Sequence, residues 1–442
     1  MAVTPPFNMY QLLDAKKRGE KLPTEAIKWM IAEYTAKRIP DYQLSAMLMA
    51  ISLKGMDAIE TAALTDAMLF SGRHLEFNDR RVVDKHSTGG IGDKASFVLA
   101  PIAACLGVKV PMIAGRGLGH TGGTVDKIEC IPGFRTDLPL EAFSKQLMEK
   151  GLVLIGQTPE IAPADRLIYA LRDVTATIDC IPLITASIMS KKLAEGAEGI
   201  VFDIKTGSGA FMREKKDARA LAKSLLATGK RFKRRGVALL TDMGQPLGNE
   251  VGHVLEIQES VRTLKGEGPK DLTDLSVELA AHMAVLAGTV KSLPEARKLA
   301  IATLKDGSAL AKFADLLNWQ GGDATIAYNL AKLPVAPVKT VIKAPKNGWV
   351  KSFANDQVGY LLIELGGGRK TKEDKLDLSV GFTFHAKVGS KVKKGDALMT
   401  IHHHAHQQSV ADHISKIFLG SVVRLSSSAV KPARLITEVV RA

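Results

Sequence analysis

The feature that most constrains the fold is a series of short apolar segments, each followed by a loop and a helix-like stretch, that begins near residue 81. The segments read RVVD, KVPMIAG, GLVLIG, GIVFDIK and VALLTDM. Apolar runs of this length that alternate with helices are typical of a largely parallel sheet with helical crossovers. The middle of the chain is therefore predicted to be a large α/β domain.

The first 70 residues follow another pattern, because their apolar residues recur at helical spacing. One run follows Thr24, a second opens at Asp41, and Asp57 with Glu60 has the spacing of a capping box that starts a third helix. This part is predicted to be a small, all-α domain. The long helix-rich segment between GLVLIG and GIVFDIK is expected to return to these helices and complete their domain.

Beyond a connection rich in Pro and Lys near residue 335, the segments WVKSF, GYLLIEL, FTFHAKV and ALMTIHH are typical of strands around the turn signal GSKVKKGD. A C-terminal β-rich (α+β) lobe is the expectation. The predicted domains are a helical domain at 1–70 and 160–195, an α/β domain at 75–157 and 196–335, and the C-terminal lobe at 345–442.

The charge balance indicates a soluble basic surface and does not by itself identify a ligand. The 442 residues include 60 Lys and Arg against 46 Asp and Glu, a formal net charge of +14, which attracts phosphate esters or nucleic acid. Aromatic residues make up only 5% of the chain and the basic residues are scattered, a pattern that does not favour nucleic acid as a partner.

Two further observations bear on the compartment. No apolar stretch approaches membrane-spanning length, and the amino terminus has no apolar core followed by a small-residue cleavage site, so we expect a cytoplasmic protein without a membrane partner. The three cysteines are odd in number and widely separated, which predicts reduced thiols rather than disulfides or a zinc site.

The first candidate site is the glycine-rich segment KHSTGGIGDKAS, which runs from Lys85 to Ser96 between a predicted strand and a predicted helix. Its glycines, Gly89 among them, let backbone amides approach an anion, and a helix amino terminus adds positive potential. Lys85 supplies charge, and the hydroxyls of Ser87 and Ser96 can donate to phosphate oxygens. On the glycines alone, a phosphate cradle and a plain tight turn both stay open.

A second glycine-rich segment, GRGLGHTGGTVDKIE, follows the next apolar strand. Loops at the carboxyl ends of adjacent strands face one crevice, where open α/β folds bind ligands, and Thr124 is placed to add a third hydroxyl. We predict no metal site here. Four residues are expected to form a structural network that fixes the loop, namely Arg116, His120, Asp126 and Glu129.

The third candidate is the helical segment YALRDVTATIDCIPLITASIMSKK. Ser187 and Lys191 lie four residues apart and therefore share one helix face. Together with Arg172 they form a donor set suited to carbonyl oxygens or to a ring N–H that has become an anion. As a bare pattern, Arg and Lys on a helix are more often solvated surface, so at the level of the residues both interpretations stay open.

These segments closely resemble the thymidine and pyrimidine-nucleoside phosphorylase family. The resemblance continues through FDIKTGSGAFM, LLTDMGQPLGN, LGGGRK and SVGFT over nearly the whole chain, and the GRGLGHTGGT block is among the most specific of the family. It implies a pentosyltransferase that forms a homodimer through its helical domain and binds phosphate in its α/β domain, with the active site in the cleft between them. The implied reaction is reversible phosphorolysis of thymidine and deoxyuridine to the free pyrimidine and 2-deoxy-α-D-ribose 1-phosphate.

The resemblance also implies the roles of individual residues, with inorganic phosphate as co-substrate and no metal or organic cofactor. The implied phosphate-binding residues are Lys85, Ser87, Gly89, Ser96 and Thr124. The implied base-binding residues are Tyr169, Arg172, Ser187 and Lys191. His86 would protonate or hydrogen-bond the base as an imidazole near its working pKa, while Arg172 and Lys191 would stabilise the departing pyrimidine anion.

The chain departs from the family pattern in two places. Ala114 stands where the family normally has serine, so one phosphate hydroxyl is missing. Lys94 stands at a loop position that is threonine in relatives that bind a monovalent cation, and Glu250 replaces a small residue of that site. The hypothesis is that the Lys94 ammonium stands in for the ion, with Glu250 and Glu259 as partners.

Several alternatives stay open. One is a broad-specificity pyrimidine-nucleoside phosphorylase that also cleaves uridine, since Met112 and Thr185 resemble the thymidine-specific branch but YALRD is closer to the broader one. A phosphoribosyltransferase of the same superfamily is another, although the intact KHSTGG and SIMSKK segments speak against it. A third is a basic nucleic-acid-binding protein. The alternating His402, His404 and His406 are expected to be an exposed cluster without a metal.

Overall fold

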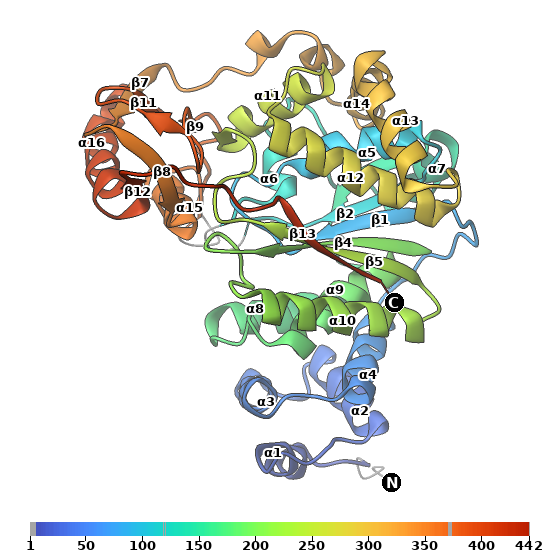
Figure 1. The fold of residues 1–442 in the computed structure, drawn as a ribbon. Coiled ribbons are helices and arrows are strands. Elements are labelled where there is room, and N and C mark those ends of the chain that lie inside the picture. The colour runs from blue at the N-terminus through green and yellow to red at the C-terminus, as the bar shows by residue number, and fades with distance from the viewer. Residues whose placement is uncertain (1–5, 118, 120, 370–373, 442) are drawn as a thin grey trace.

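The computed structural model describes residues 6–117, 119, 121–369 and 374–441. Figure 1 shows three parts along the molecule: helices near the amino terminus, an α/β domain with one main sheet, and a C-terminal domain with two small sheets. The fold class expected from the sequence, a helical domain with a large α/β domain and a C-terminal β-containing lobe, is confirmed. Among the described residues, no helix combines the length and the apolar character that a membrane crossing requires.

The helical domain joins two separate stretches of the chain. Its helices are α1 (Met9–Lys17), α2 (Thr24–Thr35), α3 (Asp41–Lys54), α4 (Ala58–Leu69), α8 (Pro163–Val174) and α9 (Ile181–Ala194). The predicted capping box starts α4, because the Asp57 carboxylate accepts the Glu60 N–H and the Glu60 carboxylate accepts the Asp57 N–H, each at 2.9 Å. Ile168 of α8 and Leu183 of α9 lie in one buried apolar cluster with α1–α4.

The central sheet is parallel except at one edge. Its parallel strands are β1 (Val83–Ser87), β4 (Gly199–Thr206) and β5 (Arg235–Asp242), with β2 (Val110–Ala114) and β3 (Leu152–Gly156) paired beside them. A parallel bridge between Val82 and Lys109 links the two groups. Because β1 extends to Ser87, Lys85 and His86 lie in the strand itself and not in the loop that follows it.

Helices cover both faces of this sheet. The helices are α5 (Ala95–Cys105), α6 (Thr124–Ile128), α7 (Leu140–Lys150), α10 (Lys215–Arg231), α11 (His253–Leu264), α12 (Lys270–Ala287), α13 (Leu293–Lys305) and α14 (Ser308–Trp319). In Figure 1, α9 and α10 lie below the sheet, and α5 and α12 lie above it. Every residue of β4 is buried, as expected of a parallel strand covered on both faces.

The C-terminal domain contains two antiparallel sheets, with strand orders β10-β8-β12 and β6-β9-β11-β7. The strands are β6 (Glu250–Val251), β7 (Val338–Lys343), β8 (Gly348–Phe353), β9 (Gly381–Phe384), β10 (Lys391–Val392), β11 (Ala397–His403) and β12 (Val423–Ser426). Two helices, α15 (Asn355–Glu364) and α16 (Gln408–Ile417), complete it. Since β6 comes from the α/β domain, the second sheet joins the two domains.

The structure differs from two expectations for this region. GYLLIEL lies mostly in α15 and not in a strand, because Val358, Leu361 and Leu362 are buried at helical spacing, which a short apolar run does not reveal. The last strand, β13 (Ile436–Arg441), pairs antiparallel with β5 and so belongs to the main sheet and not to the lobe expected at 345–442. Pairing between such distant segments leaves no local sequence pattern.

The late histidines are only in part the exposed cluster that the sequence suggested, because His402 is buried, His404 is half-buried and His406 is exposed. His402 and His403 are 7% and 0% exposed because β11 is a central strand. His402 Nε2 lies 2.9 Å from Thr383 Oγ1, and the rings of His404 and His406 stack with centroids 5.7 Å apart. Within the described ranges, no three His, Cys, Asp or Glu side chains are grouped so that they could hold a metal ion.

Candidate active site

A cavity of about 600 Å³ lies between α8 and α9 on one side and the carboxyl ends of β1 and β2 on the other. Of the ten residues that the sequence predicted for the site, the cavity is lined by Lys85, His86, Ser87, Gly89, Ser96, Tyr169, Arg172, Ser187 and Lys191. The tenth, Thr124, begins α6 directly behind Gly122 and Gly123, which do line it. The three candidate segments therefore meet at one place.

The phosphate side of the cavity is built from β1 and the loop after it. Lys85 is buried, and its Nζ donates to Ser96 Oγ at 3.2 Å. Gly89 has a φ of +86°, which favours glycine, and its N–H donates to Ser87 Oγ at 3.1 Å. Ser87 Oγ in turn donates to Asp93 Oδ2 at 2.5 Å. Because a hydroxyl has one proton, an anion would compete with Asp93 for it.

The opposite side is built from α8 and α9. Lys191 Nζ donates to Ser187 Oγ at 2.9 Å, so the shared helix face expected from their spacing is confirmed. The same ammonium also donates to the carboxylate of Asp165. Lys191 Nζ lies 5.8 Å from the ring centroid of Tyr169, a cation–π distance. These contacts place positive charge and an aromatic face together at the cavity wall.

Arg172 is held rigidly in the same wall. It is 1% exposed, so it is not the solvated surface residue that the bare pattern allowed. Its guanidinium donates to the backbone carbonyls of Thr177, Ile178 and Leu183 at 3.2, 2.8 and 3.1 Å. A guanidinium has five N–H donors, so two remain for a ligand.

His86 also lines the cavity and is the last residue but one of β1. Burial lowers the pKa of its imidazole well below the ordinary value, and the nearby ammonium groups of Lys192, Lys191 and Lys85 lower the pKa further. The neutral form of the ring is therefore favoured at neutral pH, and whether His86 protonates or hydrogen-bonds the base stays a prediction. A neutral ring can donate one hydrogen bond but cannot supply a proton as an imidazolium can.

Two residues that the sequence analysis missed also line the cavity. Asp165 is buried and lies on α8 at helical spacing from Tyr169 and Arg172, a periodicity that could have revealed it. Arg369 comes from the C-terminal domain and pairs with Asp126 at 2.8 and 3.1 Å. Nothing in the local sequence around Arg369 indicates that it reaches this cavity.

The charged residues of the second glycine-rich segment form a network, as predicted. Arg116 donates to Asp126 Oδ1 at 3.0 Å and to Glu129 Oε2 at 2.6 Å. Asp126 also accepts the N–H of Gly117 at 2.6 Å. His120, the fourth residue of the predicted network, lies outside the described residues. The network fixes the loop that forms one rim of the cavity.

Lys94, near the end of the first glycine-rich segment, sits in a cage of oxygens. Its fully buried Nζ donates to the backbone carbonyls of Leu247 and Glu250 at 2.9 and 2.6 Å and to Glu259 Oε2 at 2.6 Å. Glu250 contributes its carbonyl and not its carboxylate, which accepts instead from Thr383 at 2.6 Å. That an ammonium here stands in for a monovalent cation stays a hypothesis.

Comparison with known proteins identifies the family. Residues 10–72 match the model described as "Glycosyl transferase family, helical bundle domain", residues 79–310 its a/b domain, and residues 349–418 "Pyrimidine nucleoside phosphorylase C-terminal domain". The pyrimidine-nucleoside phosphorylase of Staphylococcus aureus (strain USA300) is 45% identical over 437 residues, which is 98% of this chain and 100% of that protein. The chain belongs to the pyrimidine-nucleoside phosphorylase family.

Other comparisons agree with this assignment. The pyrimidine-nucleoside phosphorylase of Geobacillus stearothermophilus is 45% identical over 432 residues, 97% of this chain and 99% of that protein. A solved anthranilate phosphoribosyltransferase from Thermus thermophilus superposes with a TM-score of 0.58 and 21% identity, covering 70% of this chain and 98% of that one. At 21% identity, the comparison with the phosphoribosyltransferase shows only that the two proteins share a fold.

Proposed function

We propose that the chain catalyses the reversible phosphorolysis of thymidine and deoxyuridine in pyrimidine nucleoside salvage or catabolism. The observation that carries the proposal is the single cavity in which Lys85 and Ser96 face Tyr169, Arg172 and Lys191. One wall has donors suited to phosphate, and the other has cations beside an aromatic ring, suited to a base that leaves as an anion. The name pyrimidine-nucleoside phosphorylase carried by the relatives supports this reaction class.

In the proposed mechanism, a phosphate oxygen forms a bond to C1′ of the deoxyribose as the bond from C1′ to N1 of the base breaks. Positive charge develops on the sugar, and the electron pair of the broken bond goes to the base. Lys191 and the two free N–H groups of Arg172 stabilise that pair. His86, which lines the cavity, donates a hydrogen bond to the departing base. The attacking hydrogen phosphate brings one proton, which the base anion takes up, so that neutral pyrimidine and the dianion of the sugar phosphate are formed.

The proposal includes inorganic phosphate as co-substrate and needs no metal or organic cofactor. It also includes a homodimer formed through the helical domain. Exposed apolar residues on α3 support such an interface, because Tyr42, Met49 and Leu53 recur at helical spacing and are 74%, 37% and 76% exposed.

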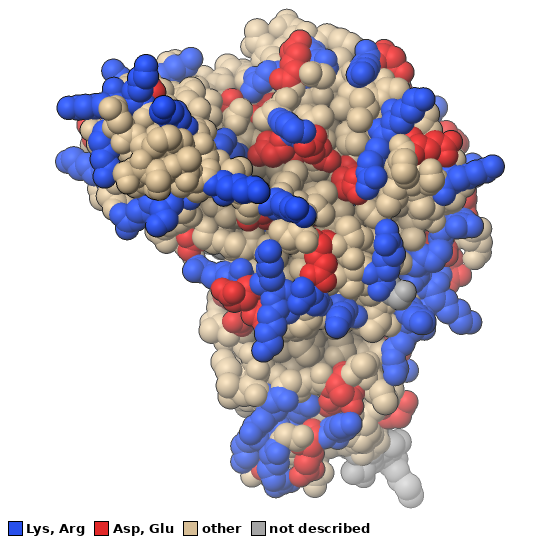
Figure 2. All heavy atoms as spheres, viewed as in Figure 1, with Lys and Arg blue, Asp and Glu red and all other residues tan. Residues whose placement is uncertain are grey.

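The nucleic-acid alternative finds little support on the surface. On the face that Figure 2 shows, Lys and Arg occur over every part of the molecule, with Asp and Glu between many of them. A nucleic-acid site more often gathers basic side chains into one stripe or patch. The net positive charge is better explained as a field that draws phosphate toward the cavity.

The reaction is tested by incubating the protein with thymidine, with and without phosphate, and following free thymine by chromatography. Thymine should appear only when phosphate is present, because in the proposed reaction phosphate, and not water, attacks C1′ of the deoxyribose. Equal release without phosphate would make the protein a hydrolase and remove the phosphate role of Lys85, Ser87 and Ser96. Dialysis against phosphate-free buffer controls for carried-over anion.

Sugar selectivity is the next prediction. Met112 is buried at the cavity wall, and its apolar side chain offers no partner to a 2′-hydroxyl. Burying that hydroxyl unpaired costs about 1–3 kcal/mol, so kcat/KM for uridine should be about ten- to a hundredfold below that for deoxyuridine. Deoxyuridine should be cleaved nearly as well as thymidine.

The relatives' general name leaves a broad-specificity enzyme as a second candidate function. Steady-state kinetics on uridine and deoxyuridine separate the two candidates. Equal efficiencies would assign the broad specificity, and Met112→Lys would then change the ratio little. If the enzyme is selective, Met112→Lys should raise the relative efficiency with uridine.

Ala114→Ser should strengthen phosphate binding, because Ala114 ends β2 at the cavity and serine would add one hydroxyl donor there. One neutral hydrogen bond contributes about 0.5–1.5 kcal/mol net, so KM for phosphate should fall several-fold. KM for thymidine should stay the same and is the internal control. An unchanged phosphate KM would mean that the missing hydroxyl is already compensated.

A further inference from the structure

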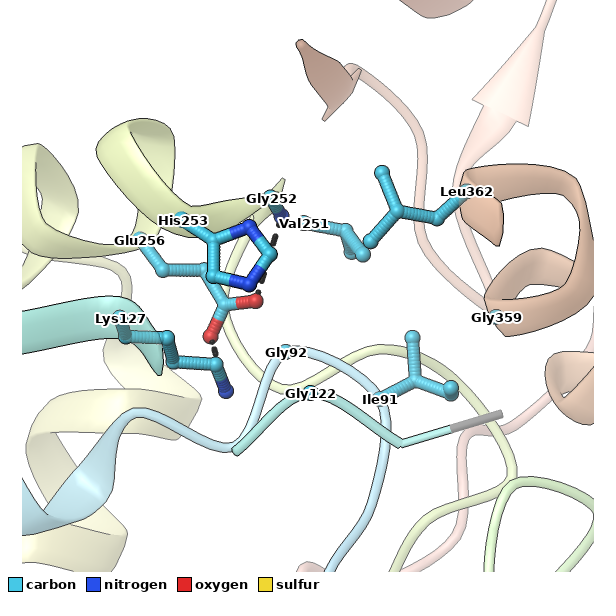
Figure 3. Close-up of a pocket in the computed structure, with 10 residues that line it drawn as sticks. All are labelled: Ile91, Gly92, Gly122, Lys127, Val251, Gly252, His253, Glu256, Gly359 and Leu362. Carbon is cyan, nitrogen blue, oxygen red and sulfur yellow. Dashed lines mark hydrogen bonds and ion pairs between the residues drawn. The ribbon is translucent and has the colours of Figure 1, made fainter. Parts of the chain in front are cut away.

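A second buried lysine, outside the predicted site, lies beneath the phosphate side of the cavity. Lys127 is on α6, the helix that Thr124 begins, and is 1% exposed. Its Nζ donates to the backbone carbonyl of Asp93 at 2.9 Å and lies 2.8 Å from Glu256 Oε2. Figure 3 shows the Lys127 and Glu256 side chains pointing toward each other beside the turns at Gly92 and Gly122.

These contacts join three separate segments. Asp93 belongs to the first glycine-rich segment, and its carboxylate accepts the hydroxyl of Ser87. Lys127 belongs to the second glycine-rich segment, and its side chain lies against the glycines of that segment, since a Cβ on Gly122 would lie 3.1 Å from Lys127 Cε. Glu256, on the first turn of α11, is fixed from the other side because its Oε1 accepts the Gly252 N–H at 3.2 Å.

The ammonium also contributes charge. Although burial raises the pKa of Asp93, the ammonium groups of Lys205, Lys85 and Lys127 together keep the pKa of that carboxyl below its ordinary value. Asp93 therefore stays an anion that accepts the hydrogen bond from the Ser87 hydroxyl. A positive charge in this low-dielectric position also favours an anion bound in the loops above it.

We propose that Lys127 is a positioning residue for phosphate, which holds the two glycine-rich segments at a fixed separation by binding the Asp93 carbonyl and Glu256. The inference rests on the proposed function, since it assigns phosphate to these loops. The role is one of geometry, because Lys127 does not line the large cavity and so does not touch the substrates there. A small displacement of either loop should weaken phosphate binding, because the hydrogen bonds from backbone amides to an anion depend strongly on distance and direction.

The test is Lys127→Met, which keeps the length of the side chain and removes the charge and the donor. KM for phosphate should rise by about tenfold or more, while KM for thymidine should stay within about twofold of the wild type. Calorimetric titration of inorganic phosphate into the nucleoside-free protein should show the same loss of affinity. This measurement does not depend on turnover.

The matched control is Lys16→Met. Lys16 and Glu60 form a buried ion pair of the same length, 2.8 Å, in the helical domain, with side chains 3% exposed. This variant should lose stability without a selective change in phosphate affinity. If Lys127→Met does not fold, Glu256→Gln serves as a second variant. It keeps the shape of the side chain and its contact with the Gly252 N–H but removes the negative charge. It should raise the KM for phosphate about threefold.

The outcomes separate the two hypotheses. A wild-type protein that shows no phosphate-dependent turnover contradicts the proposed function itself. If the wild type turns over but Lys127→Met and Glu256→Gln leave phosphate affinity unchanged, or change the KM of both substrates equally as Lys16→Met does, the positioning role is wrong.

Discussion

Lys191→Met should lower kcat/KM for thymidine by on the order of a hundredfold or more, mostly through kcat. In the proposed mechanism, Lys191 stabilises negative charge that appears on the base only as the glycosidic bond breaks, so its loss should act on the transition state more than on substrate binding. Steady-state kinetics at saturating phosphate measure the effect. Near-normal efficiency would refute the assignment of Lys191.

Interpreting that variant needs a control, because Lys191 also pairs with Asp165. Removing the lysine leaves a buried carboxylate whose Oδ1 has no hydrogen-bond partner among the described residues. In the double variant Asp165→Asn with Lys191→Met, that stranded charge is absent. If the double variant recovers near-normal kcat, the loss came from the stranded carboxylate and not from the missing ammonium.

Arg172→Met should have an effect of similar size but is less easily interpreted. The guanidinium holds the backbone of Thr177, Ile178 and Leu183 between α8 and α9. Its removal therefore moves the wall of the base site as well as removing a charge. Lys191 gives the sharper test of charge stabilisation.

Lys192→Met should destabilise the protein by about 3–5 kcal/mol, because it breaks a fully buried ion cluster. Lys192 Nζ donates to Asp84 Oδ2 at 2.5 Å, to both carboxylate oxygens of Glu195 at 2.9 and 3.1 Å, and to the Ile113 carbonyl at 3.1 Å. The cluster links α9, on one wall of the cavity, to β1 and β2, on the opposite wall. Thermal unfolding measures the loss, and Lys270→Met, which breaks an exposed pair with Asp274, should change stability by no more than about 1 kcal/mol.

The same variant should show a pH dependence of stability with a defined sign. Burial raises the pKa of Glu195 well above its ordinary value in the folded protein, so the folded state holds this proton more tightly than the unfolded state. Stability from this group therefore falls as pH rises from the ordinary carboxyl range toward the raised value. Without Lys192, the negative charge of the Glu195 carboxylate has no ammonium beside it, so ionising this group at high pH costs more. The deficit of Lys192→Met should be larger at about pH 8 than at about pH 5, and the opposite trend would contradict the account.

The sequence predicted those parts of the fold that local patterns encode. The strands of the α/β domain, the capping box at Asp57 and Glu60, and the helix face shared by Ser187 and Lys191 all follow from short-range spacing. It could not predict β13 beside β5, because that pairing depends on contacts between distant segments. It also misassigned GYLLIEL, whose apolar run fits a helix and a strand equally well.

The candidate site shows the same division. Lys85, Ser96, Arg172 and Lys191 could be singled out because the segments that carry them resemble a known family. The state of His86 could not, since its lowered pKa depends on burial and on lysines that come from β1 and α9. Lys127 could not be predicted from the sequence, because a lysine on a short helix carries no signal apart from its buried contacts with Asp93 and Glu256.

The most direct test of the central claim is the ³¹P spectrum of the protein incubated with thymidine and inorganic phosphate. We predict that the inorganic phosphate signal declines and a sugar 1-phosphate signal grows, in equal molar amount to the thymine released. Thymine released without a new phosphate ester would contradict the claim that this cavity transfers the deoxyribosyl group to phosphate.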